Sequence, residues 1–336
     1  MIVGIDDAGD FKSKDLGMFA AVYIRPKKLD KIRLVFEKWE NTLPDDCRVD
    51  GEVKGWKLNE KQIIDFAKNV IRENGFGQIR HQVFAIPINK LSFEALDQQR
   101  SLHVTQYREG VDMYRKQGKE FDLIAGQFKQ MADWLESKSL KTLAKIELLG
   151  FTIYESFNNS IAISVLRGFD RELGKLTIKI DQGLVDRPSS NSYWRDTMRN
   201  LFWNQSARGK GMIHIREWKS NHPFLKRFMK YPKSRDKLAV FTKEIRECMN
   251  FYDSKDHFEI RIADIIASTY YRHYVEKQNI GKSIRELKTS KLGKGSFTII
   301  NVAPRKGPPI PNPYTDKIDG VSMDDLESRY SSDHQD

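Results

Sequence analysis

The chain opens with an apolar run that breaks abruptly into acids. Residues 1–5 are Met-Ile-Val-Gly-Ile, and Asp6 and Asp7 follow at once. A short apolar run that ends at turn-forming residues predicts a buried strand in the middle of a sheet. Residues 176–181 repeat this pattern, with alternating apolar positions that lead to Asp181. We therefore expect both aspartates at the ends of interior strands, where α/β proteins place their sites.

The spacing of apolar residues predicts further elements. Apolar runs bounded by turn residues predict strands over 17–24, 79–88, 212–215 and 293–302. Apolar positions recurring at three and four residues predict helices over 27–41, from the N-cap Asn59 to 71, over 238–251 and over 258–275. The mixture of strands and helices predicts an α/β protein.

The 336 residues, 39% of them hydrophobic, are enough for a sizeable core in one large or two modest domains. The block from about 91 to 171 is helical in pattern and carries few residue types that suggest chemistry, so we interpret it as a helical insertion or cap. Prolines recur from Pro304 to Pro313, and the last residues are polar and acid-rich. We therefore expect a domain over 1–303 and an extended or disordered tail over 304–336.

Four acids stand out by their positions. Asp6 and Asp181 follow predicted strands, and Glu52 lies in a glycine-flanked loop with Lys54 two residues on. Asp264 interrupts an apolar helical pattern, where a carboxylate is costly unless it is paired or bound to a cation. Hard cations such as Mg²⁺ prefer oxygen ligands, and two such ions can activate water and stabilise the leaving oxygen of a phosphodiester. We predict that the four acids converge on Mg²⁺ or Mn²⁺, with two ions.

Each acid also has an ordinary interpretation. An aspartate after a strand often forms a turn or caps a helix. Asp264 could form a structural ion pair with Arg261 or Arg272. Glu52 and Lys54 could be a solvated loop pair. The joint pattern therefore carries the prediction.

The same positions resemble a known family. The run Ile5-Asp6-Asp7-Ala8-Gly9-Asp10 resembles the Asp-Glu-Ser-Gly opening of the bacterial and phage domain-of-unknown-function 3800 family. The second acidic motif of that family resembles residues 52–55, and its central strand aspartate resembles Asp181 within 178–181. Its closing Ser…Leu-Gln-Leu-Ala-Asp motif resembles residues 253–267. The chain departs from the family at Asp7-Ala8, where the family has Glu-Ser, and at Arg261, where it usually has Gln.

This resemblance implies an RNase H-like fold, in which helices flank a mixed central sheet and the acids meet at one end of it. It implies metal-dependent cleavage of phosphodiester bonds, with Asp6, Glu52, Asp181 and Asp264 as metal ligands. Lys54 would steady a phosphate or the attacking water. Members of the family often occur in mobile or antiviral gene neighbourhoods, which suggests a defence effector.

The charge of the chain favours a polyanionic partner. The formal net charge is +11, and residues 207–237 carry ten Lys and Arg against two acids, with aromatic residues between them. Such a segment suits a phosphate backbone and unstacked bases, and we expect it near the acids. The alternative is that its aromatics belong to the core and its lysines to a solvated face. The candidate nucleic-acid contacts are Arg208, Lys210, Lys219, Lys226, Arg227 and Lys230.

Other features narrow the class of protein. The two cysteines, Cys47 and Cys248, are far apart, which disfavours a disulfide framework or a zinc knuckle and fits a reducing cytoplasm. No apolar run reaches the length of a membrane helix, and Asp6 and Asp7 interrupt any signal-peptide pattern. We expect a cytoplasmic location and no membrane partner.

The leading hypothesis is a nuclease acting on RNA or DNA. Besides nucleic acid, the expected partners include another protein or a second copy of the chain. One alternative function is a non-catalytic nucleic-acid-binding or scaffolding protein with the same fold. Another is a restriction-type core built from Asp45 and Glu52-Val53-Lys54, which would leave the later acids unused.

Overall fold

A mixed sheet forms the centre of the computed structural model, which describes residues 1–9, 11, 16–72, 79–184, 218–230, 239–240, 247–288 and 297–300. In the described part the sheet has six strands in the order β10-β5-β2-β1-β6-β9. The strand β2 runs antiparallel to both its neighbours, whereas β1, β6 and β9 run parallel to one another. The strands are β1 (Ile2–Ala8), β2 (Leu16–Ile24), β5 (Ile79–Pro87), β6 (Thr177–Asp181), β9 (Met249–Tyr252) and β10 (Phe297–Ile299). The predicted α/β class is confirmed.

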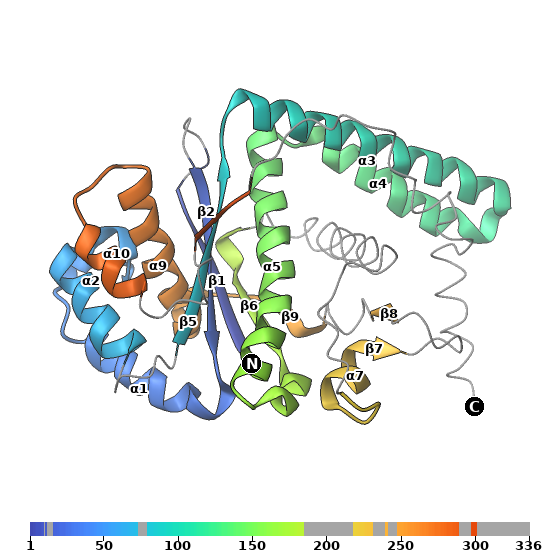
Figure 1. The fold of residues 1–336 in the computed structure, drawn as a ribbon. Coiled ribbons are helices and arrows are strands. Elements are labelled where there is room, and N and C mark those ends of the chain that lie inside the picture. Colours follow the sequence, from blue (N-terminus) through green and yellow to red (C-terminus); the bar gives the residue numbers. More distant parts are fainter. Residues whose placement is uncertain are drawn as a thin grey trace.

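Helices cover both faces of this sheet (Figure 1). One face carries α1 (Leu29–Glu40), α2 (Glu60–Phe66), α9 (Phe258–Tyr274) and α10 (Gly281–Lys288). The other face carries α5 (Leu140–Leu166). The remaining elements are α3 (Lys90–Gln117), α4 (Asp122–Ser137), α7 (Pro223–Phe228), and the short pairs β3 (Arg48–Val49) with β4 (Glu52–Val53) and β7 (Met229–Lys230) with β8 (Ala239–Val240).

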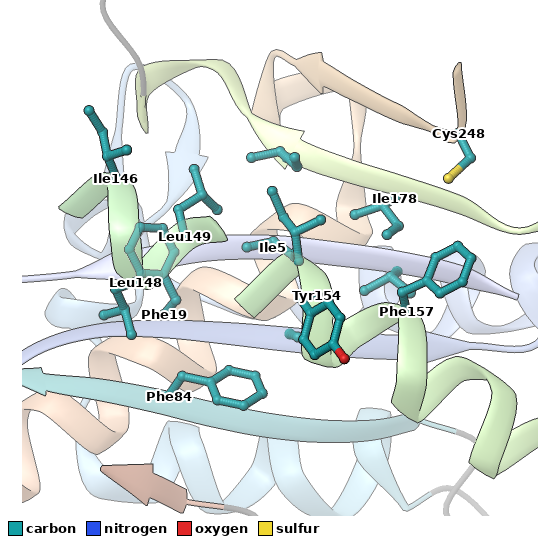
Figure 2. Packing of buried hydrophobic residues seen from close by; sticks show 14 of the residues in the cluster. Ile5, Phe19, Phe84, Ile146, Leu148, Leu149, Tyr154, Phe157, Ile178 and Cys248 are labelled. Carbon is teal, nitrogen blue, oxygen red and sulfur yellow. The ribbon is translucent and has the colours of Figure 1, made fainter. Parts of the chain in front are cut away.

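Alternation along β1 assigns its residues to the two faces. Val3 and Ile5 are fully buried in the core under α5. Figure 2 shows Ile5 in this core beside Ile178 of β6. Gly4 points the other way, and a Cβ built there would overlap the backbone of Glu259 in α9. Glycine therefore allows the backbone of α9 to touch the strand. Successive side chains of a strand point to opposite faces, so Asp6 lies on the same face as Gly4.

The helical block over 91–171 has two different parts. The helices α3 and α4 run side by side and extend beyond the sheet (Figure 1). They have a small core of their own, made by Val111, Tyr114 and Ala125. In contrast, α5 packs directly on the sheet and contributes most of its buried residues to the main core. Of the two interpretations of this block, α3 and α4 therefore resemble an insertion and α5 resembles a cap, because a sheet with two apolar faces needs a helix on each.

Three other sequence predictions are compared here with the described residues. The capping box of Asn59 with Gln62 is confirmed, and so is the helix over 258–275, observed as α9. The helix predicted over 238–251 was wrong near both ends, where residues 239–240 form strand β8 and residues 249–252 form strand β9 in parallel register with β6. Apolar spacing alone did not distinguish a helix from this short edge strand, because pairing with β6 is a tertiary interaction. The elements predicted at 212–215 and 304–336 lie outside the described residues.

Candidate active site

Asp6 and Asp181 lie on one face of the sheet, at neighbouring positions. The parallel register pairs Ile5 with Ile180, so the two aspartates come next on adjacent strands. Lys179, two residues before Asp181, contacts Glu259 of α9, which places Asp181 on the α9 face as well. Asp181 ends β6 as predicted, whereas β1 continues to Ala8 because β2 pairs with it up to that residue.

Asp264 faces this pair from α9 and is 8% exposed. Its Oδ2 accepts a hydrogen bond from the backbone amide of Gly55 at 3.0 Å, and its Oδ1 accepts one from Ser268 Oγ at 3.1 Å. A Cβ on Gly55 would lie 2.6 Å from Ile265 Cα, so this glycine lets the loop after β4 sit directly on α9. The loop that carries Glu52 and Lys54 is thereby fixed beside Asp264.

Glu52 and Lys54 complete the cluster. Glu52 is 5% exposed, and its Oε2 accepts a hydrogen bond from Ser254 Oγ at 3.2 Å and pairs with Lys54 Nζ at 2.9 Å. Its other oxygen, Oε1, is buried and has no hydrogen-bond partner. A buried carboxylate oxygen without a partner costs free energy, so it is a potential ligand for a cation or a water.

The charges of these side chains act on one another. Burial raises the pKa of Asp6 well above its ordinary value, and the carboxylates of Asp264 and Asp181 raise it further. Burial also raises the pKa of Asp264 to about 6, against the opposing effect of the Gly55 amide. The pKa of Asp181 is raised by burial as well, with Lys54 and the Gly183 amide acting against it. Like charges that share a buried site disfavour ionisation, so these acids lie close enough to form one electrostatic unit.

Lys54 is the cation of this cluster. Burial lowers the pKa of its ammonium group, but the hydrogen bond from Lys54 to Glu52 and the charges of Glu52, Asp264 and Asp6 outweigh burial and raise the pKa overall. The lysine therefore stays protonated at neutral pH. It supplies the nearest compensating positive charge to acids that come from four separate segments.

The alternative structural role predicted for Asp264 is wrong. Arg261 pairs instead with Glu40, at 2.7 Å to both carboxylate oxygens. Arg272 donates to the carbonyl oxygens of Gly55 and Leu58. Neither arginine neutralises Asp264, which leaves its carboxyl group to the cluster. The guanidinium group of Arg261 is consequently committed to a contact with α1.

Asp7 does not belong to the cluster in the same way. It points to the opposite face of the sheet from Asp6, where its Oδ2 pairs with Lys145 Nζ of α5 at 2.8 Å. Asp45, the acid of the restriction-type alternative, is exposed in the turn before β3.

The residues that sequence reasoning missed are Ser254, Ser268 and the Gly55 amide. Their signal was present, because Ser268 follows Asp264 by one helical turn and Ser254 lies in the closing motif.

The acidic cluster has the donor atoms that a hard divalent cation prefers, but its side chains are not arranged around a single point. Its donors are carboxylate oxygens, as Mg²⁺ and Mn²⁺ prefer, and Glu52 Oε1 is a buried donor without a partner. In the conformation described, however, no group of three or more His, Cys, Asp or Glu side chains among the described residues could hold a metal ion. In this conformation Lys54 is paired with Glu52, one of the proposed ligands.

In the basic segment over 207–237, the described residues make contacts that differ from the predicted contacts with nucleic acid. Phe224 and Phe228 of α7 are buried in the core, so they cannot stack on bases. Arg227 donates to the carbonyl oxygens of Gly174 and Leu176, which precede β6, whereas Asp181 ends it. These residues therefore lie at the end of the sheet opposite the acids, and the predicted proximity was wrong for them.

The other predicted nucleic-acid contacts are only partly described. Lys219 and Lys226 are exposed. Arg208, Lys210 and the side chain of Lys230 lie outside the described part of the chain.

Comparisons of this chain with protein-family models, with curated proteins and with solved structures found no match. Within the described residues, no helix is long and apolar enough to cross a membrane.

Proposed function

We propose that this chain is a metal-dependent nuclease with an RNase H-like fold, related to the domain-of-unknown-function 3800 family. The observation that carries the proposal is the electrostatic coupling of Asp6, Asp181 and Asp264 at one end of the sheet, with Glu52 and Lys54 beside them. Buried like charges are unfavourable for folding. A protein that keeps them together fits a site whose ligand supplies the missing positive charge.

The topology supports the fold proposed from the resemblance. The first three long strands, β1, β2 and β5, form an antiparallel meander, and β6 and β9 add in parallel on the other side of β1. The acids then come from the central strand, from its parallel neighbour and from a helix packed across both. Segments far apart in sequence are held there on rigid elements.

In the proposed reaction a water molecule loses a proton to solvent as its oxygen attacks phosphorus, the bond to the leaving oxygen breaks, and the leaving oxygen takes up a proton from solvent. Asp6, Asp181, Asp264 and Glu52 are the residues that would hold Mg²⁺ or Mn²⁺. A bound ion of this kind polarises phosphoryl oxygens and lowers the pKa of water. The ammonium group of Lys54 would contact a non-bridging phosphate oxygen, while Ser268 and the Gly55 amide keep the carboxylate of Asp264 in place.

The test is cleavage of end-labelled RNA and DNA by the purified protein in Mg²⁺, in Mn²⁺ and in EDTA. We expect cleavage in at least one metal, and Asp181→Asn should abolish it while leaving nucleic-acid binding intact. Asp65→Asn is the matched control, because Asp65 is exposed on α2, remote from the cluster, and should retain full activity. A wild-type protein inert on every substrate, or an Asp181→Asn protein as active as wild type, would refute the proposal.

A second function has one observation in its favour. The ion pair of Lys54 with Glu52, and the absence of a ready metal-holding group among the described residues, suit a non-catalytic nucleic-acid-binding protein. Calorimetric titration with Mg²⁺ and Mn²⁺ separates the two functions. Binding that Asp181→Asn weakens favours the nuclease, and an absence of binding up to millimolar metal favours the binding protein.

A further inference from the structure

Trp56 is a large aromatic side chain left open to solvent beside the acidic cluster. It is 59% exposed, and it belongs to neither of the two cores that flank the sheet. Lys57 lies over its ring, with Nζ 5.4 Å from the ring centroid. Exposing this much aromatic surface forgoes the gain from burial, so a role in binding is a reasonable explanation.

The backbone around Trp56 is held firmly. Trp56 is the middle residue of the 3₁₀ turn Gly55–Lys57, in which the Lys57 amide donates to the Lys54 carbonyl oxygen at 3.0 Å. Arg272 of α9 donates to the carbonyl oxygens of Gly55 and Leu58, on either side of the turn. Lys57 Nζ donates to the Arg48 carbonyl oxygen at 2.9 Å. An aromatic side chain on a fixed turn loses little conformational entropy on binding.

The same turn is attached to the proposed catalytic residues. The Gly55 amide, one residue before Trp56, donates directly to Asp264 Oδ2, and Lys54, two residues before it, pairs with Glu52. Trp56 is therefore one residue from a direct contact with the acids and two residues from the lysine that pairs with Glu52. Lys57 places a further positive charge 5.4 Å from the ring centroid, and cations beside an aromatic ring suit a strand with a phosphate backbone.

We infer that Trp56 stacks on an unpaired base of a single-stranded nucleic acid next to the phosphate at the acidic cluster. The inference rests on the proposed function and adds a substrate class to it. In a duplex both faces of a base are covered by its neighbours, so this tryptophan discriminates in favour of single strands. Stacking uses the face that all bases share, and selectivity among bases is accordingly weak.

The experiment measures binding without cleavage, in the Asp181→Asn background with Mg²⁺. Fluorescence anisotropy follows a labelled oligothymidylate, an oligouridylate and a blunt duplex, each of about 20 nucleotides or base pairs, a length that exceeds common single-strand site sizes. The variants are Trp56→Ala, Trp56→Tyr and the control Leu166→Ala. Leu166 is 82% exposed and ends α5, near the start of β6 and remote from the acids.

Trp56→Ala should weaken single-strand binding on the order of tenfold, the scale of one lost stacking contact. Trp56→Tyr should restore most of the affinity, and Leu166→Ala should leave it unchanged. The weaker duplex binding should not respond to Trp56→Ala. Unchanged single-strand affinity in Trp56→Ala, an equal loss on the duplex, or no rescue by tyrosine overturns the inference, as does a protein that binds no oligonucleotide.

These results are independent of the cleavage assay. If the protein never cleaves but Trp56→Ala weakens single-strand binding, the nuclease proposal is refuted and the inference about Trp56 is kept. If the protein cleaves but Trp56→Ala leaves single-strand binding unchanged, the nuclease proposal is kept and the inference is overturned. The oligothymidylate and oligouridylate arms identify whether the single strand is DNA or RNA.

Discussion

The two ends of the central sheet both carry charged side chains, but they treat charge in opposite ways. Where β2 ends and β6 begins, Arg25 pairs with Glu172 at 2.6 Å, and this hydrogen-bonded pair holds the pKa of Glu172 below its ordinary value. At the other end, burial and neighbouring carboxylates raise the pKa values of Asp6 and Asp264. The carboxylate of Glu172 therefore has an opposite charge beside it, whereas the carboxylates of the cluster are poorly compensated, as the proposed metal site would require.

The largest effect is expected when one carboxylate is removed from the acidic end of the sheet, where Asp6 and Asp264 lie. Asp6→Asn should reduce cleavage at least a hundredfold, a typical loss when an electrostatic contribution to the transition state is removed. In EDTA the same change should raise the melting temperature, because it removes a buried like charge. Activity assays and thermal melts check both effects. A variant that is less active and also less stable in EDTA would mean that Asp6 is a structural acid.

The acidic end should also make stability depend on pH. Asp264 has a pKa of about 6 in the folded chain against an ordinary value of 3.8, so the folded state binds more protons between those values. The free energy of unfolding in EDTA should therefore fall as pH rises from about 4 to 6, by on the order of 2 kcal/mol, and stay lower above that range.

Urea denaturation of the wild type, Asp264→Asn and Asp65→Asn at several pH values checks this effect. Asp264→Asn should flatten the decline, and Asp65→Asn should retain it. Added Mg²⁺ should stabilise the protein more at pH 8 than at pH 5, since ionised carboxylates bind it. Equal pH dependence in all three proteins would contradict the assignment.

The smallest effect is expected from a substitution at the other end of the sheet, where Arg25 pairs with Glu172. Glu172→Gln should lower the free energy of unfolding at pH 7 by less than about 1 kcal/mol, because the pair with Arg25 is partly exposed. The pKa of Glu172 is lowered in the fold, so its contribution is present above its ordinary pKa of 4.5 and is lost as pH falls through its folded value. Cleavage should not change. A loss of cleavage in Glu172→Gln would show that the two ends are coupled.

How far the sequence could predict this arrangement depends on the range of the interactions. Asp6 and Asp181 were found because their strands are apolar runs that end in acids, and Asp264 because an acid interrupts an apolar helix. The strand at 249–252 was missed, since it depends on a partner distant in the chain. Arg227 was predicted to contact phosphate because its positive charge can be read from the sequence. The carbonyl oxygens that it binds belong to residues distant in the chain, so the sequence does not reveal them.

The bare α-carbon of Gly4 has a consequence for how the acids meet a cation. The backbones of β1 and α9 touch there, so main-chain contact fixes the spacing of the two elements that carry Asp6 and Asp264. These elements cannot move closer together, and side-chain rotation remains to change the distance between the two carboxylates. If the cluster binds a cation as proposed, the folded backbone is already in place, and the rearrangement falls on side chains such as Glu52 and Lys54.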